Sequence, residues 1–334
     1  MKRIVILIVC LTTYFMISCN SNAVRPDALA EKAMNELEKV LHEQSLFIKV
    51  HAAEYLIWLG HNEEAKQVYL AEDSLHNKEM PYRIGIWRVL AQAEDKEENK
   101  TKWISRVFDV YADPNAPDRL HATETLAKLQ QSPLAKYPGI TAKTLSSENR
   151  NLNTYALWAI SYSSDSALNK NRSIFLSLAL EDSNQVIRKI SAYILRKMGR
   201  LTAKDWELLA EKALAEPQTS TMRHSLLNTA FVTLPSAVNA STQRMGDIYK
   251  EMLKDSHLFN TGERIELALS LADKGEAADL PVLTSMLDNE NISGIYEAGS
   301  KEGADVRATA AYAILKIKQR LGALAFNNKP VHQQ

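Results

Sequence analysis

The amino-acid sequence predicts an all-α protein in which about eight helical hairpins stack into one array. Glycine and proline, which interrupt helices, number only 11 and 10 among 334 residues. Apolar residues recur at helical spacing, and no runs of alternating apolar and polar residues repeat along the chain. A short pattern of residue types also returns every 34 to 43 residues, which is typical of repeat proteins built from helical hairpins.

The N-terminus has the features of a bacterial lipoprotein leader. Lys2 and Arg3 precede an apolar run, residues 4–17, that is too short for a stable membrane span. The run ends in Met-Ile-Ser-Cys, with a small residue directly before Cys19. This junction resembles the lipobox of bacterial lipoproteins, in which the leader is cut before the cysteine and the thiol is acylated. The alternative is an ordinary signal peptide, residues 1–18, followed by an incidental cysteine.

Processing at this junction would leave a lipid on Cys19, a linker over residues 19–26, the repeat array over 27–321 and a disordered tail over 322–334. Cys10 would leave with the leader, so the mature chain would have no free thiol, no disulfide and no cysteine metal site. The full chain has 40 basic and 40 acidic residues, and loss of the leader would bring the net charge to about −2. This balance argues against nucleic acid as a partner.

The repeating pattern starts with an apolar residue and a basic residue, followed by two small residues and then apolar residues at helical spacing. The clearest copies start at Ile48, Ile187 and Val306. Looser copies start at residues 82, 118, 152, 222 and 263. With the first residue numbered 0, positions 0, 4, 8 and 11 fall within about 80° of a helix circumference and predict a buried stripe. Each copy therefore marks the second helix of a hairpin. The first helices are expected at residues 28–42, 62–73, 96–111, 167–181, 203–215 and 277–288.

The fourth copy has two possible registers. A start at Leu152 keeps the apolar stripe but places Asn153 where other copies have a basic residue. A start at Asn149 would recover Arg150 but would put two asparagines in the core. The first register is preferred.

The pattern resembles HEAT repeats, including the shorter bacterial type named after phycobilisome lyases, over most of residues 27–321. In that family the basic residue joins a ladder with an aspartate just before the helix, which implies the pairs Asp182–Arg188 and Asp305–Arg307 here. Tetratricopeptide repeats are the competing interpretation, but the later spacings of 41 and 43 residues favour HEAT repeats. An open array of this kind is expected to unfold in more than one step.

Two histidine–glutamate pairs are candidate metal ligands. His51 with Glu54 and His121 with Glu124 occupy the same positions in the first and third copies, and each pair shares one helix face. Packed helices lie about 8–10 Å apart, so the two pairs would be roughly 20 Å from each other and could not share one ion. We expect no metal site and surface hydrogen bonding for both pairs.

Aromatic residues of the fourth copy suggest a binding surface. Tyr155, Trp158 and Tyr162 lie on one helix face, away from the buried stripe. The HEAT resemblance places second helices on the concave side, where these residues would extend a partly lined groove over the first four copies. The predicted ligand-binding residues are His51, Trp58, His121, Tyr155, Trp158 and Tyr162. The alternative is that the neighbouring hairpin, or a loop at residues 131–139, covers these aromatic side chains.

The expected function is that of a non-catalytic interaction scaffold that binds a protein or an extended polymer in its concave groove. No nucleophile elbow, glycine-rich phosphate loop, HExxH motif or EF-hand loop is present, so no catalytic residue and no cofactor is predicted. The alternatives are a carbohydrate-binding accessory lipoprotein and, with less support, a lyase-like enzyme.

Two further features bear on location and binding. Asn20 after the expected lipid site differs from the aspartate that retains lipoproteins at the inner membrane of enteric bacteria, and no acidic cluster follows it. The periplasmic face of an outer membrane is therefore expected. Residues 289–304 form a Gly-, Ser- and Asn-rich insert, which either contributes to function or is a loop insertion without a function.

Overall fold

The computed structural model describes residues 27–322, apart from 219, 237–238 and 289–302. The leader, the expected lipid site Cys19, the tail from residue 323 and nearly all of the insert lie outside the described residues. Within the described ranges the chain is all-helical and contains no strand. None of the helices searched there is long and apolar enough to cross a membrane.

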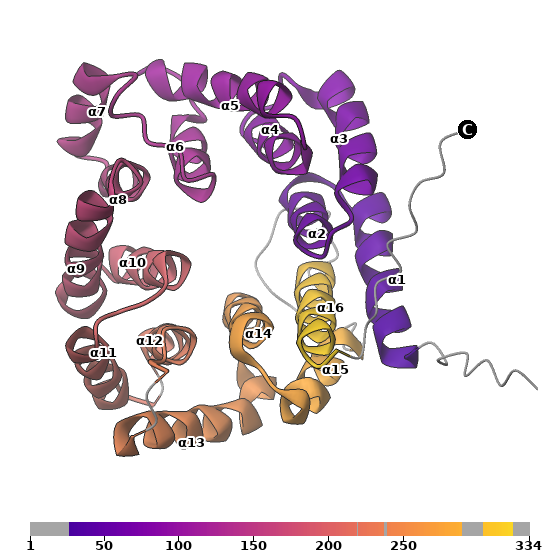
Figure 1. Cartoon of the computed structure of the whole chain (residues 1–334), viewed down its shortest axis with the longest axis vertical. Coiled ribbons are helices and arrows are strands. Elements are labelled where there is room, and N and C mark those ends of the chain that lie inside the picture. The colour runs from indigo at the N-terminus through magenta and orange to yellow at the C-terminus, as the bar shows by residue number, and fades with distance from the viewer. Residues whose placement is uncertain (1–26, 219, 237–238, 289–302, 323–334) are drawn as a thin grey trace, which may run out of the picture.

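The described residues form sixteen α-helices and two 3-10 helices. The odd-numbered helices are α1 (Ala28–Glu43), α3 (Asn62–His76), α5 (Glu97–Ala112), α7 (Pro138–Leu145), α9 (Asp165–Glu181), α11 (Ala203–Ala215), α13 (Ala240–Lys254) and α15 (Leu280–Asp288). The even-numbered helices are α2 (Leu46–Trp58), α4 (Tyr82–Ala93), α6 (Arg119–Lys128), α8 (Arg150–Ser161), α10 (Gln185–Met198), α12 (Thr221–Val232), α14 (Thr261–Lys274) and α16 (Gly303–Arg320). The 3-10 helices are η1 (Ser256–Leu258) and η2 (Ala277–Asp279). Odd-numbered helices lie on the outside and even-numbered helices on the inside (Figure 1).

Each copy of the sequence pattern coincides with an inner helix, as predicted. The residues at position 4 are buried in all eight copies: Ala52, Ile86, Ala122, Ala156, Ser191, Leu226, Leu267 and Ala310. Asparagine caps mark two of the helix starts, since Asn184 accepts hydrogen bonds from the first turn of α10 and Asn260 forms a capping box with Glu263 at the start of α14. Local spacing and capping therefore specify the inner helices.

The inner helices form a closed ring. Each of them contacts the next, and α16 also packs against α1 and α2, so the two ends of the array meet (Figure 1). The sequence was expected to form an open groove instead. Closure follows from α16, which buries side chains around nearly its whole circumference and therefore needs neighbours on several sides.

Specific contacts join α16 to the first hairpin. Arg307 donates to Glu36 of α1 at 2.6 Å. Asp305 is hydrogen-bonded to the Nδ1 atom of His51, at 3.0 and 3.1 Å for its two oxygens. The ring of Tyr312 stacks on Tyr55 with 4.7 Å between centroids. We refer to these α1/α2–α16 contacts as the seam.

The two ion pairs expected from the HEAT resemblance are wrong. Asp182, just before α10, pairs with Arg150 of the preceding inner helix, and Arg188 of α10 pairs with Glu216, just before α12. Arg83 and Asp118 make the same kind of pair between α4 and the start of α6, with hydrogen bonds of 2.7 and 3.0 Å. The basic side chain thus reaches forward to the acidic residue before the next inner helix rather than to the one before its own. Asp305 and Arg307, the second predicted pair, instead bind His51 and Glu36 in the seam.

Candidate functional site

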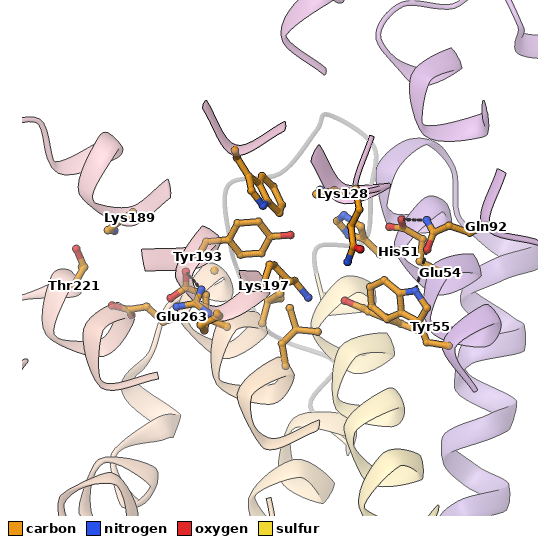
Figure 2. Close-up of a pocket in the computed structure, with 18 of the residues that line it drawn as sticks. His51, Glu54, Tyr55, Gln92, Lys128, Lys189, Tyr193, Lys197, Thr221 and Glu263 are labelled. Atoms are coloured by element: carbon orange, nitrogen blue, oxygen red, sulfur yellow. Dashed lines mark hydrogen bonds and ion pairs between the residues drawn. The ribbon is translucent and has the colours of Figure 1, made fainter. Parts of the chain in front are cut away.

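A cavity of about 470 Å³ lies inside the ring, within the size range of small-molecule binding sites. Helices α2, α6, α8, α10 and α14 contribute most of the lining, and Gln92 of α4 and Thr221 of α12 complete it (Figure 2). Inner helices from most of the ring therefore contribute to one site. Four of the lining residues, Trp58, Gln130, Lys197 and Asn260, are exposed to solvent.

Aromatic side chains form much of the apolar wall. Trp58, at the end of α2, is 39% exposed, and its indole N–H donates to Gln92 at 2.9 Å. Across the ring, Trp158 of α8 is only 1% exposed and meets Tyr193 of α10 edge-on, with 5.8 Å between centroids. Its indole N–H donates to the hydroxyl of Tyr162 at 3.0 Å. Bonds and ring contacts of this kind fix the orientation of the aromatic faces.

The buried Glu54 carboxylate lies at one side of the cavity. Arg88 of α4 donates to both of its oxygens, at 2.7 and 3.0 Å, and Gln92 donates a third hydrogen bond at 2.7 Å. Burial opposes ionisation, but the adjacent guanidinium outweighs it and lowers the pKa of Glu54 to about 2. Glu54 is therefore a carboxylate at any physiological pH.

Most other charged groups on the wall also have a partner. Lys128 and Glu124 lie 2.8 Å apart, and despite their burial each favours the charge of the other, so the pKa of Lys128 is raised and that of Glu124 is lowered. Arg196 donates to Glu266 of α14 at 2.9 Å. Glu263 bonds to His224 at 2.8 Å, an interaction that outweighs burial and lowers the pKa of this carboxyl. These pairs neutralise much of the wall.

Two lysines on the wall are different. Neither Lys189 nor Lys197 forms an ion pair within the part of the chain that the structure describes. The ammonium of Lys197 lies 5.4 Å from the ring centroid of Trp58 and 5.8 Å from that of Tyr193, so it contacts the faces of two aromatic rings (Figure 2). The described wall therefore carries two cationic groups without a bound carboxylate.

Four of the six predicted ligand-binding residues line this cavity: His51, Trp58, Trp158 and Tyr162. The other two do not. The His121 ring stacks on Phe47 with 5.7 Å between centroids, and Tyr155 is half-buried against the core. The exposed aromatic face expected for the fourth copy is also wrong, because Tyr193 of the next inner helix covers Trp158. The alternative, burial by the neighbouring hairpin, describes Trp158 correctly.

Three of the four side chains in the histidine–glutamate pairs are bound to protein partners, whereas the buried Nδ1 atom of His121 has no hydrogen-bond partner among the described residues. The surface location expected for both pairs is wrong for Glu54, which is buried. His51 is bound to Asp305, Glu54 to Arg88 and Glu124 to Lys128. Within the described ranges, no group of three or more His, Cys, Asp or Glu side chains is arranged to hold a metal ion.

The sequence analysis missed Tyr193, Lys197 and Glu266, although the pattern contained the signal for them. Tyr193 and Lys197 are positions 6 and 10 of the copy that starts at Ile187, and Glu266 is position 3 of the copy that starts at Glu263. Trp58 and Tyr162 occupy position 10 in their own copies, Trp158 occupies position 6 and His51 occupies position 3. Extending these cavity-facing positions to the later copies would have found all three.

Comparison with known proteins adds no identification. No protein-family model matches the chain, and no curated protein is significantly similar to it.

Proposed function

We propose that this protein is a non-catalytic, lipid-anchored binding protein of the bacterial cell envelope, whose HEAT-like hairpins form a closed solenoid that holds a short glycan in the central cavity. The observation that carries the proposal is the convergence of Trp58, Trp158, Tyr162 and Tyr193 from three inner helices on one cavity of about 470 Å³. The lipobox-like junction at Cys19 supports the anchor and the envelope location.

The size of the cavity favours a small ligand over a folded one. Cavities of 300–1,000 Å³ hold drug-sized molecules, and a protein domain does not enter them. Of the expected ligands, a short glycan or the end of a longer one fits best. A closed ring also requires a polymer to enter by one end rather than to lie along an open groove.

The chemistry of the wall matches a sugar. A sugar ring has an apolar C–H face, which packs against aromatic rings, and a rim of hydroxyl groups, which need hydrogen-bond partners. Trp58 and Tyr193 offer aromatic surface, while Gln130, Lys189 and Lys197 offer polar groups around it. An apolar ligand would desolvate these polar groups without replacing their hydrogen bonds to water.

The carboxylates of the wall support binding rather than hydrolysis. A glycosidase needs one carboxyl group whose pKa is raised so that it can donate a proton near neutral pH. Here the pKa of Glu54 is lowered to about 2 and that of Glu263 is also lowered. Glu266 is bound to Arg196 by a hydrogen bond.

A glycan array with the full-length chain in mild detergent would test the proposal, followed by calorimetric titration of the glycan that binds most strongly. Replacing Trp58 by Ala should weaken that affinity at least tenfold, because an aromatic anchor in a binding site typically contributes about 2 kcal/mol or more. Trp103→Ala is the matched control. Trp103 is half-buried on outer helix α5, where Arg106 stacks on it at 4.6 Å, and it does not line the cavity.

Three outcomes would overturn the proposal. The array could show no binding, or both tryptophan variants could lose affinity equally. Binding of a protein that is unaffected by Trp58→Ala, with no glycan bound, would instead indicate a scaffold that uses its outer surface.

A further inference from the structure

The charge distribution in the cavity points to a more specific ligand. Each acidic side chain on the wall has a partner: Glu54 pairs with Arg88, Glu266 with Arg196, and Glu263 is hydrogen-bonded to His224. Of the four lysine and arginine side chains on the wall, Arg196 and Lys128 are also paired, as is His51 with Asp305. Of the two remaining lysines, Lys189 interacts electrostatically with Glu263, whereas Lys197 forms no ion pair among the described residues, so the local positive excess is centred on Lys197.

Lys197 is held ready for a ligand. It lies in the last turn of α10, and its ammonium faces Trp58, which belongs to a helix on another part of the ring. Contacts with two aromatic faces restrict the side chain while leaving its N–H groups without an acceptor among the described residues. A lysine ammonium has three donors and no acceptor, so an anionic oxygen is its best partner.

Lys189 lies eight residues earlier on α10, about 12 Å away along the helix axis at 1.5 Å per residue. Figure 2 shows it beside Thr221 and away from Lys197. The two ammonium groups therefore mark separate parts of the cavity, with Tyr193 between them in the sequence of α10. A ligand with one anionic group would meet Lys197, and a longer ligand with regularly spaced anionic groups would meet both.

We propose that the ligand is an acidic glycan, whose carboxylate or sulfate groups bind Lys197 and Lys189 while its sugar rings lie against Trp58 and Tyr193. This inference rests on the proposed glycan-binding function and adds the charge of the ligand. The ammonium of Lys197 binds one anionic group beside Trp58. Lys189 then selects for a second anionic group beside Thr221 (Figure 2).

The test uses an array with neutral, uronate-, sialate- and sulfate-bearing glycans. The strongest acidic glycan is then titrated beside its neutralised form, the methyl ester of a uronate or sialate or the desulfated form of a sulfate, which keeps the same rings. We expect acidic glycans to bind most strongly and the neutralised form to bind roughly 10- to 100-fold more weakly, as for the loss of a charge-assisted hydrogen bond. Strongest binding of uronate- or sialate-bearing glycans would identify a carboxylate as the bound group, and strongest binding of sulfate-bearing glycans would identify a sulfate.

Variants assign the effect to the lysine. Lys197→Met keeps much of the contact with the aromatic rings but removes the charge, and it should reproduce the loss seen with the neutralised glycan. Lys197→Arg should retain most of the affinity. Lys212→Met, at an exposed lysine on outer helix α11 with no ion pair among the described residues, is the matched control and should change nothing. Added salt should weaken wild-type binding more than binding by Lys197→Met.

The outcomes separate this inference from the function on which it rests. If neutral glycans bind as strongly as acidic ones, and binding requires Trp58 but not Lys197, the ligand is not selected by charge and the inference fails while the proposed function stands. If no glycan binds at all, both fail. Equal effects of Lys197→Met and Lys212→Met would also overturn the inference.

Discussion

The buried pair of Glu54 and Arg88 makes a quantitative prediction about stability. Replacing Arg88 by Met should destabilise the protein by about 3–5 kcal/mol, the usual cost of leaving one partner of a buried ion pair without the other. Arg88 is 3% exposed and Glu54 is 5% exposed, so water cannot replace the lost guanidinium. The lowered pKa of Glu54 gives a second estimate of this loss of stability. A decrease of the Glu54 pKa from 4.5 to about 2 corresponds to about 3 kcal/mol, at 1.36 kcal/mol per pKa unit.

The same pair predicts a dependence on acid. Because folding lowers the pKa of Glu54, its contribution is fully present above the unfolded value of 4.5 and is lost as the pH falls toward about 2. A variant in which Glu54→Gln is combined with Arg88→Met has no charge at either position and should lack this part of the acid sensitivity. It should also recover much of the stability lost in Arg88→Met, because a neutral amide needs no counter-charge.

Denaturant unfolding followed by far-ultraviolet circular dichroism would measure these effects, with wild type, single and double variants compared at neutral and acidic pH. An Arg88→Met variant within about 0.5 kcal/mol of wild type, the range of ordinary surface substitutions, would refute the reasoning. So would a double variant that is less stable than the single one. Either result would mean that the guanidinium does not hold a desolvated carboxylate.

Three further predictions concern the seam, the core and the anchor. Burial opposes the charged form of His51, but the nearby Asp305 carboxylate outweighs burial and raises the pKa of His51. The stabilisation by this pair should therefore be complete below about pH 6.5 and should decrease as the pH rises through the raised pKa. Wild type should therefore lose melting temperature relative to His51→Gln across that range, and a constant difference would contradict the prediction. Trp158→Ala should reduce the unfolding free energy by about 3–5 kcal/mol and Trp58→Ala by less, since only Trp158 is fully buried; the reverse order in chemical denaturation would be inconsistent with this packing. Cys19→Ala should abolish labelling by a radioactive fatty acid and leave the protein with its leader uncleaved or misrouted, whereas normal processing of that variant would exclude the lipoprotein hypothesis.

Local features of the fold could be predicted from the sequence because they depend on short-range spacing. The stripe of apolar and small residues specifies both the existence and the buried face of each inner helix, as at Ala52, Ser191 and Ala310. The four predicted residues that do line the cavity were found through the same spacing. Side-chain direction relative to a helix axis is a property of the helix itself, so a single sequence is enough to derive it.

Features that depend on two distant helices could not be predicted in this way. The face of α8 that carries Trp158 is opposite the stripe, but whether this face is exposed depends on Tyr193 of α10. The ion pairs failed for the same reason, because Arg188 reaches the acidic residue of the following hairpin. Contact between α16 and α1 depends on curvature accumulated over the whole array, and no local pattern records it.

Ring closure changes the expected mode of unfolding, and this gives a last prediction. An open array exposes a weakly supported hairpin at each end, which can unfold first. Here the seam supports both ends, so wild type should unfold in one cooperative transition rather than in the several steps expected from the sequence. Calorimetric and van't Hoff enthalpies should then agree.

Arg307→Glu would test whether the seam is responsible. It places a carboxylate against Glu36, where the wild-type pair has a donor–acceptor distance of 2.6 Å, and should separate the ends of the ring. Unfolding of this variant should become broad or stepwise, with a calorimetric enthalpy above the van't Hoff value. Lys204→Glu makes the same charge change at an exposed position on α11 and should keep a single transition. Stepwise unfolding of wild type, unchanged by Arg307→Glu, would mean that the seam does not couple the two ends. The aromatic and charged groups that face one another across the cavity would then not be held in place by closure.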